Sequence, residues 1–163
     1  MKVLLATDGS NFSKMAIDAL QQIIVEPEKT SFKIISSVEF PTMLASDPFI
    51  GASAEYYDQV EQAGRSLAKE FARQSAAQLC SLFPGVALDV TTEVLDGSPQ
   101  RVIVEKAENW AADLIVTGSH GYGFWSRALL GSVSSAVVHH AACSVLVVRK
   151  AKDSNDSVQD ALI

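Results

Sequence analysis

Cysteine is scarce in this chain of 163 residues, in which Cys80 and Cys143 are the only two. They lie far apart and lack the short spacing of metal ligands, so two buried reduced thiols are expected in preference to an isolated disulfide. Long apolar runs are also missing, since none approaches the roughly 18 consecutive apolar residues of a membrane-spanning helix. The chain passes from Lys2 directly into a strand-like segment with no small-residue cleavage site. We therefore expect a cytoplasmic protein without a membrane segment.

Basic charge is scarce as well. Lysine and arginine total 13 against 19 aspartate and glutamate residues, which gives a formal net charge of -6. A nucleic-acid partner usually requires a basic face, so no nucleic acid is expected as a ligand. The same negative charge would repel a free nucleotide unless a divalent cation or local N–H donors compensated for it.

The length of the chain suits one domain, which at this size buries about two thirds of the surface that the unfolded chain exposes. The content of 48% hydrophobic and 20% charged residues is typical of a globular protein. We predict a single domain over residues 1–150, followed by a polar tail, 151–163, that is expected to be disordered.

Short apolar runs alternate with stretches of helical periodicity along the chain. Each run predicts a strand covered on both faces, and each apolar repeat of three and four residues predicts a helix. The predicted strands are Lys2 to Thr7, Phe32 to Val38, 86 to 91, Leu114 to Thr117 and Ser144 to Val148. The predicted helices begin at Ser10 or Asn11, at Asp58, after Ser98 and near Ser132.

Three details of these predictions concern helix ends and faces. Glu39 to Tyr57 sustains no period and is expected to be a long irregular connection. Asp58 and Glu61 fit a capping box, and Ser98 is placed to cap the helix that Pro99 begins. The second predicted helix has one apolar face, which is expected to pack on the protein core. This face consists of Val60, Ala63, Leu67, Phe71 and Ala72.

The alternation of strands and helices predicts the fold class. A βαβαβαβαβ order gives an α/β protein of three layers, with helices on both faces of a doubly wound five-stranded parallel sheet. The common strand order for such a sheet is 3-2-1-4-5, and ligands bind where that order reverses. The ends of the first and fourth strands then lie together, so Asp8 and Gly118 are predicted to face one crevice. The third strand alternates apolar and polar residues, as an edge strand would.

The loop after the fourth predicted strand is rich in glycine. Glycines at 118, 121, 123 and 131 separate this strand from a helix that begins near Ser132. Glycine allows positive φ and a close approach of the backbone to a ligand, and a helix N-terminus offers N–H donors. Tight turns alone could also explain the glycines, but their combination with a helix start favours a loop that binds an anion, and we expect phosphate.

The spacing of this loop resembles that of one known family. Gly118, Gly121, Gly131 and Ser132 fit the pattern Gly-x2-Gly-x9-Gly-[Ser/Thr], the signature of the ATP-binding subclass of universal stress proteins. The segments 4–10, 112–116 and 145–148 are similar to the family as well. The resemblance covers residues 1 to about 150 and implies a Rossmann-like domain of the adenine nucleotide alpha hydrolase-like kind.

The resemblance also implies a binding site for ATP or another adenine nucleotide, with or without Mg2+. Asp8 matches the position that hydrogen-bonds the adenine, although a role in the turn and helix cap is nearly as plausible from the sequence alone. The other implied residues wall the base, wrap the ribose and phosphates, or present donors at a helix start. They are Ala6, Thr7, Val38, Thr117, Gly118, Ser119, His120, Gly121, Gly131, Ser132, Val133 and Ser134.

A nucleotide-dependent regulatory or stress-response protein is the function that the resemblance implies. It further implies a homodimer formed through the last strand, Ser144 to Val148, and a protein partner of unknown identity. The chain lacks the Walker pattern Gly-x-x-x-x-Gly-Lys-[Ser/Thr] and an obvious base with an orienting partner, which favours binding over turnover. Slow ATP hydrolysis or autophosphorylation is one alternative. A nucleotide-independent interaction module, with Phe124 and Trp125 in its contact surface, is the other.

Overall fold

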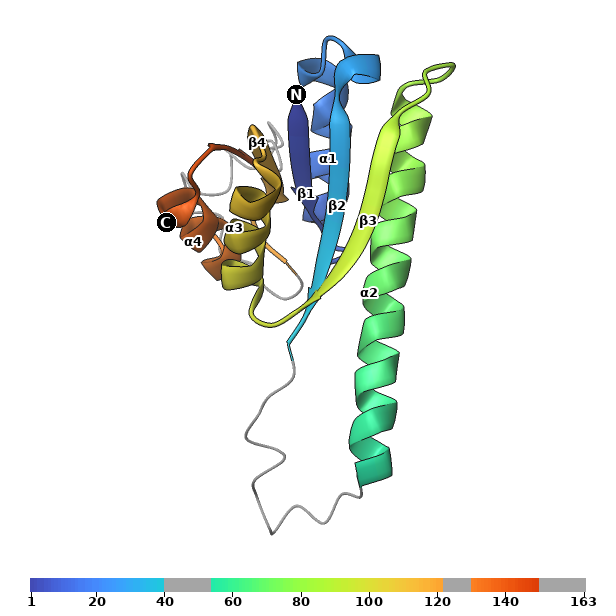
Figure 1. The fold of residues 1–163 in the computed structure, drawn as a ribbon, viewed down its shortest axis with the longest axis vertical. Coiled ribbons are helices and arrows are strands. Elements are labelled where there is room, and N and C mark those ends of the chain that lie inside the picture. Colours follow the sequence, from blue (N-terminus) through green and yellow to red (C-terminus); the bar gives the residue numbers. More distant parts are fainter. Residues whose placement is uncertain (40–53, 122–129, 150–163) are drawn as a thin grey trace, which may run out of the picture.

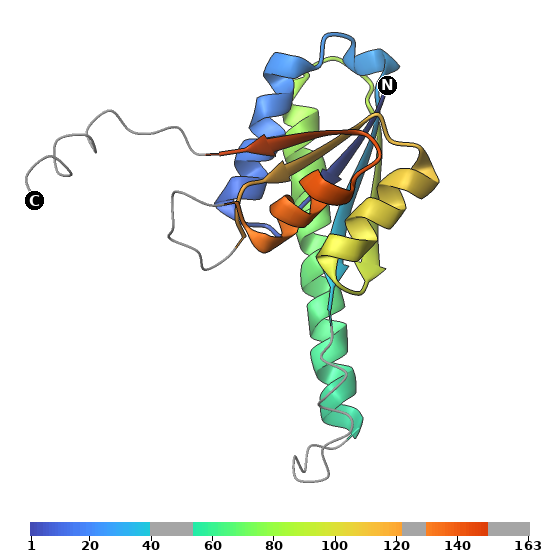
Figure 2. The same cartoon turned by 90° about the vertical axis from the view of Figure 1, so that its left-hand side faces the viewer.

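A computed structural model describes residues 1–39, 54–121 and 130–149 of the chain. Its five strands form one parallel sheet in the order β3-β2-β1-β4-β5, which confirms the predicted fold class and strand order. Helices α1 and α2 cover one face of the sheet, and α3 and α4 cover the other (Figures 1 and 2). The elements are β1 Lys2–Ala6, α1 Asn11–Ile23, the 3-10 helix η1 Pro27–Lys29, β2 Ser31–Val38, α2 Ala54–Leu82, β3 Asp89–Asp96, α3 Pro99–Trp110, β4 Leu114–Gly118, α4 Ser132–His140 and β5 Ser144–Val148.

The central strand β1 divides the core into two clusters. Val3 and Leu5 point to the side of α1 and α2, where they pack with residues such as Leu20. Leu4 and Ala6 point to the opposite side, toward α3 and α4. Because successive side chains of a strand alternate between its faces, a wholly apolar strand is required where both faces are covered. This explains why β1 carries no polar residue after Lys2.

Two helix starts test the predicted caps. Ser10 is the N-cap of α1, and its side chain accepts a hydrogen bond from Ser13 N at 3.3 Å, as predicted. Pro99 begins α3, which is also confirmed. Ser98 is the N-cap residue of α3, as predicted, but its side chain forms no capping bond, because its hydroxyl donates to Gln100 Oε1 at 3.2 Å.

The third strand lies at the edge of the sheet, as predicted, but its range was wrong. It runs from Asp89 to Asp96 and pairs with β2 over eight positions, from Ser31↔Asp89 to Val38↔Asp96. Val86 lies instead in a turn, where its N–H bonds to Phe83 O at 3.2 Å. Pairing with β2 begins at Asp89, and the apolar residues before this position do not reveal that start.

The second helix also departs from the prediction. α2 begins at Ala54, so residues 54–57 are helical and Asp58 lies inside the helix, where it cannot form a capping box. Its buried stripe consists of Ala68, Ala72, Ser75 and Leu79. Val60, Ala63 and Leu67 are exposed, which contradicts the core-facing role predicted for them. The N-terminal half of α2 extends well beyond the sheet (Figure 1).

Both cysteines are free, so the expected absence of a disulfide between them is confirmed, but the expected burial is wrong. Cys80 is exposed on α2, and Cys143 is partly buried just before β5. Desolvation raises the pKa of the Cys143 thiol, and the nearby charge of Asp113 raises this pKa further.

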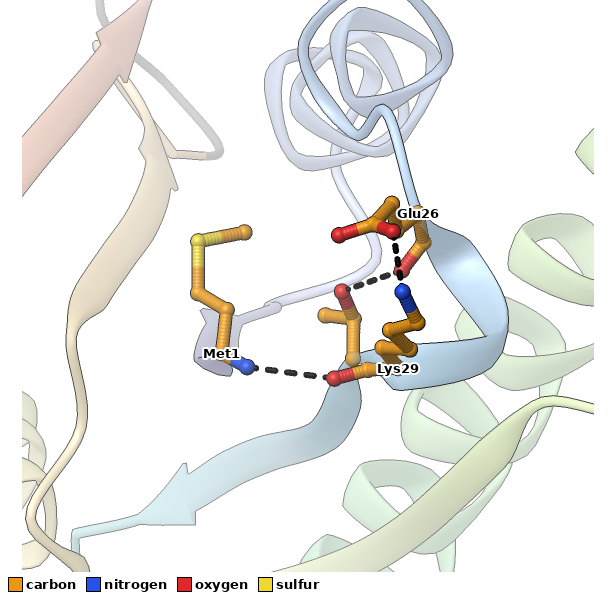
Figure 3. A network of polar contacts seen from close by, with 4 residues as sticks. Met1, Glu26 and Lys29 are labelled. Carbon is orange, nitrogen blue, oxygen red and sulfur yellow. Dashed lines mark hydrogen bonds and ion pairs between the residues drawn. The ribbon is translucent and has the colours of Figure 1, made fainter.

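The N-terminus is held near the start of β2 by a small polar network (Figure 3). The amino group of Met1 donates to Lys29 O at 3.1 Å, and the Lys29 ammonium pairs with Glu26. These contacts lie at the end of the sheet opposite the carboxyl ends of the strands. No helix in residues 1–39, 54–121 or 130–149 is long and apolar enough to cross a membrane. The predicted tail 151–163 lies outside the described residues.

Candidate functional site

A cavity of about 690 Å³ lies at the carboxyl ends of β1, β2 and β4. Its volume is within the usual range of small-molecule sites, roughly 300–1,000 Å³. Asp8 and Gly118 both line it, as predicted from the reversal of the strand order. Twelve of the thirteen site residues implied by the resemblance border this cavity: Ala6, Thr7, Asp8, Thr117, Gly118, Ser119, His120, Gly121, Gly131, Ser132, Val133 and Ser134.

Val38 is the residue of this set that does not border the cavity. Ile35, Ser37 and Glu39 do, because alternate positions of an extended strand face the same side. Val38 therefore points to the other side, and its carbonyl accepts a hydrogen bond from Gly97 N at 2.9 Å.

The turn between β1 and α1 forms one wall, which we call the β1 wall. Asp8 Oδ1 accepts a hydrogen bond from Ser10 N at 3.0 Å, so this carboxylate does stabilise the turn. Gly9 in this turn has a φ of 76° and packs against Phe71 of α2 so closely that a Cβ would lie 2.3 Å from the ring. The second carboxylate oxygen, Oδ2, faces Gly121 across the cavity, where a Cβ on Gly121 would lie 2.6 Å from it.

Buried hydroxyl groups anchor the β1 wall to α2. Ser75 Oγ donates to Thr7 Oγ1 at 3.0 Å, Thr7 Oγ1 donates to Ser13 Oγ at 3.3 Å, and Ser13 Oγ donates to Ser10 O at 2.9 Å. Thr7 Oγ1 also accepts from Gly9 N at 3.3 Å. Because buried hydroxyls without partners are costly, this chain of donors fixes the geometry of the wall.

The opposite wall, the β4 wall, consists of the described residues 117–121 and 130–134. The carbonyl of Ser119 accepts from Gly131 N at 2.8 Å and from Ser134 Oγ at 3.0 Å. These two bonds hold the start of α4 against the end of β4. The first N–H groups of a helix have no partner within the helix, so the start of α4 presents donors and a partial positive charge to the cavity.

The glycines of the β4 wall serve close packing. Positive φ among the described glycines occurs at Gly9, Gly85 and Gly97, and not at Gly118, Gly121 or Gly131. A Cβ at Gly118 would lie 2.7 Å from the backbone carbon of Phe12, and one at Gly131 would lie 2.9 Å from Ser119 O. These glycines therefore allow close packing around the cavity, and the positive φ that was also expected of the loop glycines is not found at these three.

A serine and a histidine meet at the end of the β4 wall. Ser119 is buried, and its Oγ lies 3.1 Å from His120 Nδ1. The ring of His120 also packs against Phe12, with 5.5 Å between the ring centroids. Both residues border the cavity. A hydroxyl beside an imidazole nitrogen is the geometry of a nucleophile and its base.

The side chains that border the cavity carry negative charge. Asp8 and Glu39 are among them, and no lysine or arginine is found among the described residues that line it. In the described segments no group of three or more His, Cys, Asp or Glu side chains could hold a metal ion. Among the residues that the structure describes, electrostatic compensation for an anion in this cavity is available from the backbone N–H groups at the start of α4, and a cation that enters with the ligand would add to it.

Sequence reasoning missed seven lining residues: Ser13, Ile35, Ser37, Glu39, Pro99, Ile103 and Leu130. Ile35, Ser37 and Glu39 alternate along β2 and the residue after it. This alternation would have identified them if the face of β2 that borders the cavity had been known. Pro99 and Ile103 come from α3, and nothing in the sequence shows how that helix reaches the cavity. Phe124, Trp125 and Gly123 lie outside the described residues.

Fold and cavity together define a doubly wound α/β protein with a cavity at the switch point of its sheet. The profile of the Universal stress protein family matches residues 1–149, and the chain belongs to this family. It is 33% identical over 152 residues to universal stress protein MJ0531 of Methanocaldococcus jannaschii, covering 93% of this chain and 83% of the relative. It is 34% identical over 158 residues to universal stress protein Sll1388 of Synechocystis sp., covering 91% and 97%.

Solved structures share the fold. The universal stress protein UspA from Lactobacillus plantarum superposes with a TM-score of 0.71 at 24% identity, covering 91% of this chain and 97% of that one. A universal stress protein in complex with cAMP gives 0.64 at 24% identity and covers 93% and 98%. A family member from Arabidopsis thaliana with AMP bound gives 0.60 at 19% identity and covers 94% of both chains.

Proposed function

We propose that this protein binds an adenine nucleotide, with ATP as the preferred ligand, and acts as a nucleotide-dependent regulator. The observation that carries this proposal is the cavity itself, which has a carboxylate on one wall and the N-terminus of a helix on the other. Family members of the same fold have been solved with cAMP and with AMP, which supports an adenine nucleotide as the ligand class.

In this proposal the two walls recognise the two ends of the nucleotide. Asp8 Oδ2 accepts a hydrogen bond from the exocyclic amino group of adenine, while the bond from Ser10 N to Oδ1 holds the carboxylate in place. The phosphates bind the N–H groups at the start of α4, where Ser132 and Val133 border the cavity. The ribose lies between the walls, beside Gly118 and Gly121.

Binding free energies support a nucleotide that contacts both walls. Micromolar affinity corresponds to about -8 kcal/mol, whereas one helix terminus contributes roughly 0.3–1 kcal/mol, or up to about 2 when partly buried. Several charge-assisted hydrogen bonds of about 1.5–3 kcal/mol each are needed in addition. Mg2+ fits this cavity as an ion carried by the phosphates and water, since it is commonly bound through few protein ligands.

Isothermal titration calorimetry on nucleotide-stripped protein, with Mg2+ present, tests the proposal. We expect ATP to bind with micromolar affinity, which is about -8 kcal/mol. Mass spectrometry of the small molecules released from freshly purified protein identifies the nucleotide independently. Absence of heat with ATP, ADP, AMP and cAMP, together with release of no nucleotide, would falsify the proposal.

A homodimer formed through β5 is part of the same proposal. β5 is an edge strand whose four valine and leucine side chains are only partly buried in one chain. An exposed apolar edge strand needs a cover, and a second copy of the same strand supplies one.

Slow hydrolysis or phosphotransfer is a second candidate, favoured by the contact between Ser119 Oγ and His120 Nδ1. In autophosphorylation the Ser119 oxygen would bond to the γ-phosphorus of ATP as the bond to the ADP oxygen breaks, so that His120 takes the hydroxyl proton and ADP leaves. Incubation with γ-labelled ATP tests this. Labelled phosphate appears on the wild type and not on Ser119→Ala if the candidate is right, and intact ATP with unlabelled protein rejects it.

A further inference from the structure

Two residues of α2 hold the turn that carries Asp8. Phe71 packs against Gly9, and Ser75 Oγ donates to Thr7 Oγ1 at 3.0 Å. Phe71 and Ser75 are four positions apart, so they lie on the same face of the helix. α2 therefore contacts the residue on each side of Asp8, while Asp8 itself borders the cavity.

The contact at Gly9 brings an aromatic ring directly against the backbone. A Cβ at this position would lie 2.3 Å from Cδ1 of Phe71 and 2.5 Å from its Cε1. The φ of 76° at Gly9 also disfavours any residue with a side chain. Because no side chain separates the ring from the chain, the position of the ring determines how far the backbone beside Asp8 can move toward α2.

The place of Phe71 differs from that of the other apolar residues at this end of the chain. Among the described residues, Phe71 belongs to neither core cluster, whereas Leu82 and Phe83 pack on one of them. Phe71 and Ser75 are also not among the described residues that line the cavity. An effect of Phe71 on a bound ligand must therefore act through the turn.

We infer that Phe71 is a positioning residue for Asp8, and that its ring determines how strongly the site prefers ATP over nucleotides with a different base edge. This inference rests on the proposed function, in which Asp8 Oδ2 accepts a hydrogen bond from the adenine amino group. Asp8 Oδ1 accepts from Ser10 N within the same turn at 3.0 Å, so a shift of the turn moves the whole carboxylate. Hydrogen bonds extend to about 3.2 Å, and a shift of about 1 Å would remove the bond to the base.

The phosphate end of the site should not depend on this ring. In the proposed function the phosphate donors are the N–H groups at the start of α4, which belong to the β4 wall. Loss of the ring should therefore weaken the recognition of the base and leave phosphate binding in place. ITP, whose base carries a carbonyl in place of the amino group, reports phosphate binding without the bond to Asp8.

Calorimetry with ATP and ITP on Phe71→Ala tests the inference. Alanine removes the ring and is well tolerated in a helix. We expect the ratio of the ATP affinity to the ITP affinity to fall about fivefold below that of the wild type, through weaker binding of ATP. Phe71→Leu keeps an apolar side chain beside Gly9 and should restore most of this ratio.

Phe83→Ala is the matched control. Phe83 is also partly buried, but it follows the C-terminus of α2 and packs on a core cluster. Its loss should lower stability and leave the ratio of the two affinities unchanged. A wild-type ratio in Phe71→Ala, or an equal fall of the ratio in both alanine variants, overturns the inference.

Hydrogen exchange in the protein without nucleotide tests the same contact independently of the proposed function. The Ser10 amide bonds to Asp8 Oδ1, so its exchange reports how often the turn opens. We expect NMR to show exchange of this amide about tenfold faster in Phe71→Ala than in Phe83→Ala. Equal exchange in the two variants overturns the inference. Faster exchange in Phe71→Ala, with a wild type that binds no nucleotide, would refute the proposed function and still support Phe71 as the residue that positions Asp8.

Discussion

The β1 wall and the β4 wall border the same cavity, but their polar groups are arranged differently. In the β1 wall nearly every polar side chain is engaged within the protein, from Ser75 through Thr7 to Ser13, and only Asp8 Oδ2 is directed at the cavity. In the β4 wall most residues are glycine or serine, and the start of α4 offers backbone N–H groups to a ligand.

This difference indicates a division of roles. A carboxylate fixed by Ser10 N is suited to read one polar edge of a base, because its position does not adapt. A helix start with glycines before it is suited to an anion, because it combines several donors with a partial positive charge. The base end should therefore determine which nucleotide binds, and the phosphate end should determine how tightly.

The largest effect is expected from Ser132→Asp in the β4 wall. Ser132 is exposed at the first turn of α4, and a carboxylate there would take up the helix donors and repel phosphate. Calorimetry should show ATP affinity reduced about 100-fold, or about 3 kcal/mol, with adenosine binding unchanged.

The fold should tolerate this change, because an acidic residue at a helix start stabilises it by about 0.3–1 kcal/mol. Ser132→Asn is the matched neutral control and should retain most of the ATP affinity. Wild-type ATP affinity in Ser132→Asp would show that the phosphates do not bind at α4.

The next effect concerns the contact between the walls. Gly118→Ala places a Cβ 2.7 Å from the backbone of Phe12, so we expect urea denaturation to show a loss of about 2–3 kcal/mol. Gly85→Ala is the control, since Gly85 has a φ of 82° and open space around it. Its cost should be that of backbone strain alone, about 1 kcal/mol. A smaller loss at Gly118 than at Gly85 contradicts the close packing of the walls.

A smaller effect is expected from Thr7→Val in the β1 wall. Valine keeps the shape of threonine but removes the oxygen that receives Ser75 Oγ and Gly9 N, so buried donors lose their acceptor. The expected loss of stability is about 1–2 kcal/mol. Thr91→Val, which removes only a 3.4 Å contact on the edge strand β3, should be nearly neutral in the same measurement.

The sequence predicted the β4 wall better than the β1 wall. Gly118, Gly121 and Gly131 are recognisable from spacing alone, because a ligand loop between a buried strand and a helix is a local pattern. The link from Ser75 to Thr7 spans 68 positions and leaves no local signal. Ser37 and Glu39 were missed for a similar reason, since the inward face of β2 is defined only by the assembled sheet.

Elements that are buried on both faces were predictable from their apolar runs, whereas partly exposed elements were not. β1 and β4 are covered on both faces, and their apolar runs identify them directly. β3 is partly exposed and takes its limits from its register with β2. α2 was misread because its amphipathic pattern includes Val60 and Leu67, which face away from the core of their own chain.

The smallest expected effect is the most specific test of the β1 wall. In Asp8→Asn the amide oxygen can still accept from Ser10 N, which directs the NH2 group toward Gly121 and the cavity. A donor would then replace the acceptor that faces the base. ATP affinity should fall about tenfold, or about 1.4 kcal/mol, while ITP, which has a carbonyl in place of the adenine amino group, should bind no worse than before. Calorimetry with both nucleotides measures the ratio of the ATP affinity to the ITP affinity. If Asp8 stabilised only the turn, ATP and ITP would weaken equally, and the wall would position the site without reading the base.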